Sequence, residues 1–210
     1  MIKITNSLSG KKEQFIPRAM PHVKMYVCGI TPYDYAHIGH GRVYVVFDVF
    51  YRMLRSQGFE VTYCRNFTDI DDKIINRAQK ELGDPQQYAQ IANRYIEAFT
   101  HDITKLGCLV PTYEPRVTDN IPEIISFIGA LVDAGKAYVV GGDVYFHINQ
   151  FPEYGKLSKQ KLDDLRAGAR VDVNEKKQDP LDFALWKGEP EGQFWQSPWG
   201  YSRPGWHIEC

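Results

Sequence analysis

One stretch, Cys28–His40, constrains this chain more than any other. A short apolar run, Val23–Val27, precedes it, and a pattern typical of an amphipathic helix begins after Gly39. A strand, a loop that contains glycine and a helix start form the arrangement with which α/β proteins bind phosphate groups. The stretch therefore predicts an α/β fold with a nucleotide site, and the thiol of Cys28 adds a soft metal ligand beside it.

The residues around this stretch predict a βαβ unit. Helical spacing continues over Gly39–Gln57, and Gly58 follows as a stop signal. The next run, Phe59–Asn66, is typical of a second strand. Strands joined through a helix of this length are expected to be parallel and buried. Ahead of the unit, Ile2–Phe15 has weak β character and predicts a strand or a hairpin.

The acidic segment Thr68–Lys73 has two interpretations. Its three carboxylates could hold a metal ion, or they could mark the start of a helix that Thr68 or Asp69 caps. The cap is favoured, because acidic side chains stabilise the positive end of a helix dipole. The helix is expected to run to Leu82, with Gly83 after it.

The later part of the chain changes character. Helices are predicted over residues 84–105 and 122–135, with a loop at Pro111–Arg116 between them. A Gly-Gly-Asp turn within residues 137–148 predicts a β-hairpin. Residues 150–205 show little periodicity, so we expect a small irregular core anchored by tryptophans.

Composition sets the class of protein. The chain has 210 residues, of which 43% are hydrophobic and 24% charged, with a net charge of -1, so no overall basic field indicates nucleic acid, although a local patch would suffice. No apolar run approaches the roughly 20 residues that span a bilayer, and the N-terminus lacks the apolar core of a signal peptide. We therefore predict a cytoplasmic protein without a membrane partner. Its four cysteines form no CxxC pair and are expected to be unpaired thiols.

Two histidines stand at the predicted helix start. His37 and His40 are three residues apart, so both rings can face one ligand, and Gly39 between them lets that ligand approach the backbone. Imidazole N–H groups in this position can donate to phosphate oxygens as charge develops on them. The plainer interpretation, two partly exposed capping side chains, stays open, because many helices carry histidines at this spacing.

Six motifs resemble bacterial cysteinyl-tRNA synthetases, a family of class I enzymes. They are Met25–Asp34, His37–Arg42, Arg65–Ile74, Gly168–Asp172, Asp182–Lys187 and Arg203–Cys210. The likeness extends from Ile2 to Cys210 and keeps the family's order of motifs. It implies the N-terminal half of a Rossmann-type (HUP-like) nucleotide-binding parallel sheet. Residues 1–136 would form that half, 137–200 a connective-peptide insertion, and 201–210 the return toward the catalytic domain.

The resemblance also implies a reaction. Cysteine and ATP, with Mg²⁺, would form cysteinyl adenylate, and the cysteinyl group would pass to tRNA(Cys). The residues that match the family's ATP-binding motif are His37, Ile38, Gly39 and His40, and the two histidines would be catalytic. The substrate carboxylate is already a nucleophile, so the protein would act by positioning and by stabilising charge at the α-phosphate.

Zinc would select the amino acid. By the resemblance, Cys28 and Cys210 match two zinc ligands. Zinc favours thiolates, and a substrate thiol on zinc ionises near neutral pH, whereas the hydroxyl of serine is harder and far less acidic. The residues implied to line the cysteine pocket are Gly29, Thr31, Thr68 and Trp206.

The chain also departs from the family pattern. The family's other zinc ligands, its lysine-rich ATP loop and its helical tRNA-binding domains would lie beyond Cys210. We therefore expect these 210 residues alone to lack synthetase activity and to bind zinc weakly, and the complete protein to be a monomer. Two alternatives remain: a cysteine-activating ligase that acts on an amino sugar in mycothiol synthesis, and a non-catalytic half-domain that binds nucleotide.

Overall fold

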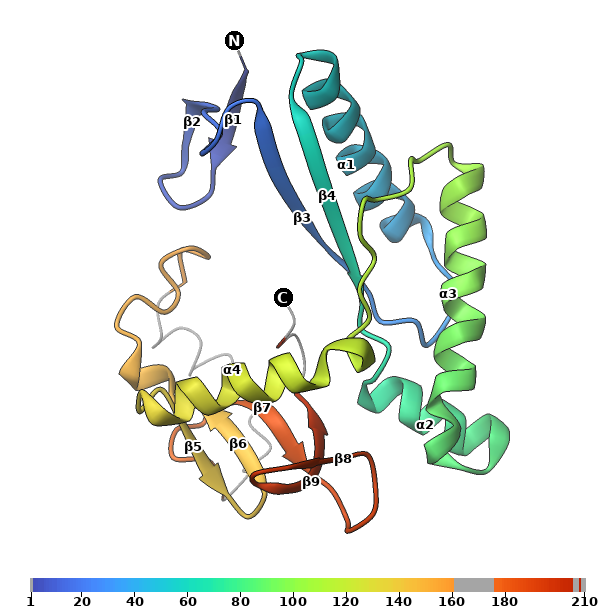
Figure 1. Cartoon of the computed structure of the whole chain (residues 1–210), viewed down its shortest axis with the longest axis vertical. Helices are drawn as coiled ribbons and strands as arrows, with labels where there is room; N and C mark the ends of the chain where they lie inside the picture. The colour runs from blue at the N-terminus through green and yellow to red at the C-terminus, as the bar shows by residue number, and fades with distance from the viewer. Residues whose placement is uncertain (1, 161–175, 206–207, 209–210) are drawn as a thin grey trace. The chain divides into compact units, whose positions relative to one another are not determined.

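The computed structural model describes residues 2–160, 176–205 and 208. It contains two compact units, which are described separately. The first unit includes Pro17–Ile121, and the second combines the residues before Pro17 with residues 122–205. Figure 1 shows long helices and parallel strands in the first and a twisted antiparallel sheet in the second.

The first unit contains the predicted βαβ arrangement. Strand β3 (His22–Ile30) and strand β4 (Glu60–Phe67) pair in parallel, and helix α1 (Ile38–Ser56) connects them. Residues along β3 alternate between buried and exposed, so one face of the sheet enters the core. The predictions of parallel strands and of a helix between them are therefore confirmed.

A segment predicted to be a loop runs beside β4. Tyr113 and Arg116 form isolated parallel bridges with Cys64 and Phe67, and the amide of Phe67 donates to the carbonyl of Pro115 at 2.9 Å. No strand forms in this described segment, so the prediction of a loop is confirmed, and the two bridges that tie the loop to β4 are what the sequence did not predict. Pro111 and Pro115 agree with such an irregular segment, because proline lacks an N–H group for a sheet and is confined to edges and irregular positions.

Two helices follow β4. They are α2 (Asp72–Leu82) and α3 (Tyr88–Lys105), and a 3₁₀ turn, Pro85–Gln87, lies between them. The cap of α2 is Asp71, whose carboxylate accepts from the amide of Lys73 at 2.9 Å. Gly83 ends the helix at φ 74°, in the left-handed region that glycine adopts easily.

The sequence placed this cap on the wrong residue. The amide of Thr68 still donates to the carbonyl of Ile30 at 2.9 Å, so Thr68 continues the sheet. Asp69 is buried and accepts from the amide and the hydroxyl of Thr118 at 3.0 and 2.6 Å. Within the described ranges, no cluster of three or more potential ligands could hold a metal ion here or elsewhere. The acidic segment is therefore a short connection after β4 followed by the start of α2 at Asp71.

The core of the first unit lies between the sheet and the helices α1 and α3. Its buried residues are Met25, Val27, Ile30, Tyr44, Tyr51, Tyr63, Phe67, Ile96, Phe99 and Ile103. On α1 the predicted helix is confirmed, but much of the apolar pattern that indicated it is not in the core. Val43, Val46 and Phe47 are 42%, 58% and 38% exposed, whereas the tyrosines of the same helix are buried.

The second unit begins with a hairpin and ends in a five-stranded sheet. The hairpin consists of β1 (Lys3–Asn6) and β2 (Lys11–Gln14), as the sequence predicted. The remaining elements are the 3₁₀ turn Thr118–Asn120 at the boundary, α4 (Ile121–Asp133), β5 (Ala137–Val140), β6 (Asp143–Phe146), the 3₁₀ turn Ile148–Gln150, β7 (Phe183–Gly188), β8 (Trp195–Ser197) and β9 (Gly200–Pro204). The strand order is β5-β6-β7-β9-β8, and every pair is antiparallel.

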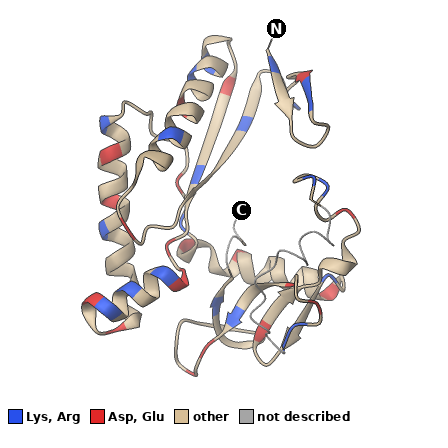
Figure 2. Ribbon diagram, turned by 180° about the vertical axis from the view of Figure 1, so that it is seen from behind, with Lys and Arg blue, Asp and Glu red and all other residues tan. Residues whose placement is uncertain are grey.

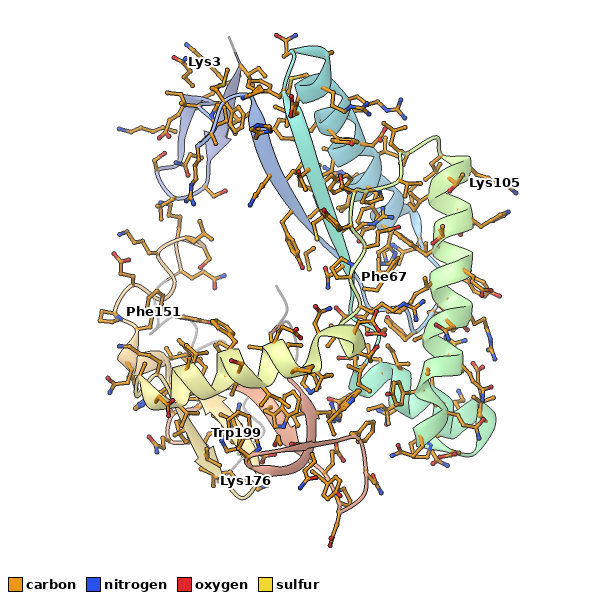
Figure 3. All side chains as sticks on the ribbon, viewed as in Figure 1. Lys3, Phe67, Lys105, Phe151, Lys176 and Trp199 are labelled. Atoms are coloured by element: carbon orange, nitrogen blue, oxygen red, sulfur yellow. The ribbon has the colours of Figure 1, made fainter. Side chains whose placement is uncertain are left out.

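This sheet corrects the expectation of an irregular core. The hairpin of β5 and β6 is confirmed, but the sequence did not predict β7, β8 or β9. Trp186 on β7 anchors the sheet: it is fully buried, and its indole N–H donates to the hydroxyls of Ser197 and Ser202. Trp199, labelled in Figure 3, packs edge-on against it, with ring centroids 6.4 Å apart. The tryptophan anchors predicted for this region are therefore present.

Charged residues of both signs are spread over the ribbon, and both signs occur on α2 and on α3 (Figure 2). This mixture agrees with the net charge of -1. Among the helices of the described residues, none has the length and apolar character needed to cross a bilayer.

A buried ion pair in the first core gives a stability prediction. Arg65, whose side chain is 4% exposed, pairs with Glu114 and lies 5.0 and 4.9 Å from the ring centroids of Tyr44 and Phe99. Glu114→Ala would leave a buried charge uncompensated, so we expect it to lower the free energy of unfolding by about 3–5 kcal/mol. Denaturant titration measures this value.

Arg65→Met is the matched control. It removes the charge and keeps most of the apolar volume, so it should cost clearly less than Glu114→Ala. Equal costs for the two variants would show that packing of the arginine, not its charge, holds this part of the core.

Candidate active site at the carboxyl ends of β3 and β4

The candidate site lies where two parallel strands end. Cys28, Gly29 and the loop that begins at Thr31 come from the end of β3, and Thr68 follows the last residue of β4. The hydrogen bond from the Thr68 amide to the Ile30 carbonyl joins the two strand ends. Figure 3 labels Phe67 at this edge. Ligands of α/β proteins bind at this end of a parallel sheet.

An irregularity in the pairing of β3 with β4 shapes the site. Val27 pairs with Arg65, and the next pair is Ile30 with Phe67, so three steps on β3 match two on β4. The extra residue makes a bulge at Cys28 and Gly29, and bulges of this kind are frequent beside active sites. The amide of Gly29 turns to a side chain and donates to Oδ1 of Asn66 at 2.7 Å.

Gly29 is required for space. A Cβ atom on this residue would lie 1.5 Å from the carbonyl oxygen of Asn66, far inside any real contact. The sequence placed Gly29 in a substrate pocket by resemblance, and the structure adds a packing reason for glycine at the same position. The close approach of two backbones sets the shape of this strand end.

Cys28 lies on the exposed side of β3. Its neighbours on that side are Lys24 and Tyr26, whereas Val23, Met25 and Val27 point into the core. The thiol is therefore at the surface of this unit. The backbone carbonyl of Cys28 accepts from the hydroxyl of Tyr44 at 3.4 Å. Burial raises the pKa of the Cys64 and Cys108 thiols, which favours their neutral form.

The two histidines form a capping box at the start of α1. Nδ1 of His37 accepts from the amide of Gly39, and Nδ1 of His40 accepts from the amide of His37, both at 3.1 Å. The ring centroids are 4.0 Å apart. Because each ring accepts at Nδ1, its neutral tautomer carries the hydrogen on Nε2. The capping role is thus observed. It leaves each ring with an N–H donor on Nε2, the nitrogen that takes no part in the cap.

Gly39 makes this arrangement possible. A Cβ atom at this position would lie 2.8 Å from Cε1 and 2.9 Å from Nδ1 of His37, so a larger residue would displace the ring. Ile38 is 90% exposed and contributes little to the core. The sequence expected Gly39 to admit a ligand to the backbone, and the structure shows that it also admits the histidine ring.

A third element holds the loop between β3 and α1. Arg77 of α2 donates to the carbonyl of Tyr33 at 2.8 Å and pairs with the carboxylate of Asp34 at 3.0 Å. Its guanidinium also lies 4.7 Å from the ring centroid of Tyr95 on α3. The loop is therefore fixed at its middle as well as at its ends.

The structure brings most of the predicted site residues to one edge of the first unit. They are Cys28, Gly29, Thr31, His37, Ile38, Gly39, His40 and Thr68. Trp206 and Cys210 lie outside the described residues. Sequence reasoning did not find Asn66, Tyr44 or Arg77, because a hydrogen bond over a long sequence separation leaves no periodic signal.

The close approach at Gly29 gives a test of the strand end. Gly29→Ala should lower the free energy of unfolding by at least the upper end of the roughly 1–3 kcal/mol range for overpacking, since the obstructing atom belongs to the backbone. Gly41→Ala in α1 is the control, because a Cβ atom there meets only the end of the Leu106 side chain at 3.3 Å. Thermal or denaturant unfolding checks both variants, and equal stability of the two would contradict the geometry.

The histidine cap predicts a pH dependence. Burial, followed by the nearby His37, lowers the pKa of His40 below the ordinary value for histidine, about 6.5. The unfolded chain therefore binds more protons than the folded one as the pH falls below about 6.5, and stability declines until the lowered pKa is passed. His40→Gln keeps an acceptor without titrating in this range, so the variant should lose part of the slope of stability between pH 7 and 5. An unchanged slope would contradict the assignment.

Comparison with known proteins shows which family the chain is similar to. The model of the class I (C) tRNA synthetase catalytic domain matches residues 14–210. The chain is 58% identical over its whole length to the cysteine–tRNA ligase of Trichlorobacter lovleyi, of which it covers 42%. It is 55% identical over 98% of its length to the chloroplastic/mitochondrial cysteine–tRNA ligase of Arabidopsis thaliana, of which it covers 36%.

A solved structure supports the fold alone. It is assigned as an arginyl-tRNA synthetase from Campylobacter jejuni and is 12% identical, with a TM-score of 0.50 over 66% of this chain and 40% of that one. The parallel strands, the helix between them and this likeness agree with the predicted Rossmann-type fold. The chain spans less than half the length of the curated relatives reported above. Its match to the family model over most of its length shows that it belongs to the class I tRNA synthetases, in the family of the (C) catalytic domain.

Proposed function

We propose that the chain acts as the first part of a cysteine–tRNA ligase. The observation that carries this proposal is the 58% identity, over the whole chain, to a protein of that name. The chain covers 42% of that relative, so the reaction belongs to a longer protein in which these residues supply part of the catalytic domain. The proposed domains are residues 1–136 as the first half of the fold, 137–200 as an insertion and 201–210 as the return.

ATP would bind at the start of α1. His37 and His40 each carry a donor on Nε2 in the tautomer that the capping box selects, while the amides of His37 and Gly39 are used by the cap itself. Such donors stabilise negative charge on phosphate oxygens. The carboxylate of cysteine would attack the α-phosphorus of ATP, pyrophosphate would leave with Mg²⁺, and no general base is needed.

Cys28 fits one position of a zinc site. Its thiol is exposed at the strand end that leads into the ATP loop, and thiolate is a preferred zinc ligand. A tetrahedral site needs four ligands, and the part of the chain that the structure describes holds no group of three. Other ligands, with Cys210 among them by resemblance, would come from outside the described residues. Bound zinc would ionise the thiol of the substrate and so favour cysteine over serine.

The exposed apolar stripe on α1 supports a longer protein. Val43, Val46 and Phe47 share one side of the helix and are 38–58% exposed. Among the described residues of this unit, the core lies against the sheet face that carries Met25 and Val27, and Tyr26 on the other face of β3 is exposed, whereas parallel sheets are usually covered on both faces. We therefore propose that the remainder of the protein covers this stripe.

The proposal fixes the remaining partners. They are ATP with Mg²⁺, L-cysteine and tRNA(Cys), and the complete protein would act as a monomer in the cytoplasm. The relatives reported above are named cysteine–tRNA ligases, which disfavours the amino-sugar ligase of mycothiol synthesis. A half-domain that binds nucleotide without catalysis would retain the α1 site and lack the reaction.

A fused protein tests the function. Residues 1–210 are joined to the remaining C-terminal part of the Trichlorobacter lovleyi relative, and exchange of labelled pyrophosphate into ATP is measured with each amino acid. We expect exchange that depends on cysteine and not on serine, followed by charging of a tRNA(Cys) transcript. Cys28→Ser should lower the exchange by more than the roughly 10–100-fold typical of residues that only support metal ligands.

Cys64→Ser is the control, because Cys64 is partly buried on β4 and should leave the exchange close to the starting value. Exchange without preference for cysteine, or transfer to an amino sugar in place of tRNA, would overturn the proposal. Exchange by the 210 residues alone would overturn the need for further chain.

A further inference from the structure

We propose that Asn66, assisted by Tyr44, is a positioning residue that fixes the direction of the Cys28 thiol. The two side chains hold the single peptide group between Cys28 and Gly29 from both of its polar ends. The geometric part stands on the structure alone. The use of the thiol as a zinc ligand rests on the proposed function.

The two hydrogen bonds meet at one peptide group. The N–H of Gly29 donates to Oδ1 of Asn66 at 2.7 Å, and the carbonyl of Cys28 accepts from the Tyr44 hydroxyl at 3.4 Å. The first bond comes from β4 and the second from α1, so the peptide is held by two elements of the first unit. Rotation of this peptide would break both bonds.

The bulge explains why side chains are needed there. With three steps of β3 against two of β4, the regular parallel ladder is interrupted between Val27 and Ile30. Polar groups within a bulge leave the ladder and need other partners. The side-chain oxygen of Asn66 is the acceptor for the Gly29 amide. Because this hydrogen bond is shorter than the one from Tyr44 to Cys28, it is the stronger of the two.

Asn66 is itself fixed in orientation. It is 2% exposed, and its Nδ2 lies 3.4 Å from the hydroxyl of Thr68, a residue that the resemblance places in the cysteine pocket. One buried amide thus contacts the backbone beside the candidate ligand and the side chain of a candidate pocket residue. A change at Asn66 is therefore transmitted to both.

Tyr44 is also held rigidly. Its ring lies edge-on to Phe99, with centroids 5.1 Å apart, and the Arg65 guanidinium lies 5.0 Å from its centroid. Tyr44 is 3% exposed. The hydroxyl therefore reaches the Cys28 carbonyl from a ring that is packed in the core. Removal of the hydroxyl alone leaves the packing of that ring unchanged.

Fixing the peptide restrains the direction of the Cα–Cβ bond of Cys28, so rotation about that bond is the main freedom left to the thiol. A ligand whose direction is set before the metal arrives loses less conformational freedom on binding, so affinity rises. Groups that orient metal ligands typically change metal affinity by about 10–100-fold when removed. We expect an effect of this size for Asn66 and a smaller one for Tyr44.

The first experiment measures the peptide directly in the 210-residue chain. Hydrogen exchange of the Gly29 amide is followed by NMR in the wild-type chain, in Asn66→Leu and in Asn66→Asp. Asn66→Leu removes the acceptor, so the amide should exchange at least about tenfold faster, whereas Asn66→Asp keeps an acceptor and should retain protection. Thr118→Val is the matched control, because it removes a different, partly buried hydrogen bond, to Asp69, without contacting the peptide.

The second experiment measures metal binding in the fused protein described above, with cobalt(II) as the probe. Thiolate coordination gives an absorption band that reports on the ligand independently of activity. Asn66→Leu should weaken cobalt binding by about 10–100-fold, while Thr118→Val should not. Tyr44→Phe should weaken it less, and it gives a second measurement if Asn66→Leu fails to fold.

The outcomes separate the two proposals. Equal exchange of the Gly29 amide in the wild-type chain and in Asn66→Leu overturns the positioning role, and so does equal cobalt affinity in wild type, Asn66→Leu and Tyr44→Phe. If the wild-type fused protein gives no thiolate band, the zinc part of the proposed function fails, while the amide measurement still decides whether Asn66 holds the peptide.

Discussion

The site depends on the close approach of β3 and β4 at Gly29. The carbonyl of Asn66 occupies the space of a side chain at that position, and the amide of Gly29 bonds to the side chain of the same asparagine. This contact draws the two strand ends together and leaves an extra residue on β3, which forms the bulge. The bulge turns the chain out of the sheet just before the loop to α1. The position of the thiol and the entry into that loop therefore have one origin in backbone packing.

The local features of the first unit could be predicted from the sequence, and their partners could not. The apolar run before Cys28, the helical spacing after Gly39 and the glycine at 83 each have a physical cause within a few residues. The cap of α2 was assigned to Thr68 or Asp69, although Asp71 forms it, because the sequence does not reveal that Asp69 is used by Thr118 across 49 residues. Local rules identify the type of element, and long-range bonds decide its boundary.

The second unit shows the same limit more strongly. Its strands β7, β8 and β9 are short, and their sequences lack the regular alternation of apolar and polar residues that indicates a strand. The sheet forms because Trp186 is buried and bonds to serines 11 and 16 residues later, a partnership that a window along the sequence does not detect. The candidate ligands and histidines could be named from the resemblance, but the supporting residues Asn66, Tyr44 and Arg77 required the structure.

The capping histidines show how one group can support both the fold and the proposed chemistry. Each imidazole has two nitrogens, and Nδ1 of each ring satisfies an amide at the start of α1. That bond sets the tautomer, so Nε2 becomes the donor, and burial together with the neighbouring ring disfavours protonation of His40. A neutral ring can stay in the cap while it donates to phosphate, whereas a protonated ring would lose its acceptor at Nδ1. For His40 the fold therefore favours the neutral form that the proposed ATP site needs, and in both histidines the cap uses Nδ1 while the proposed contact with phosphate would use Nε2.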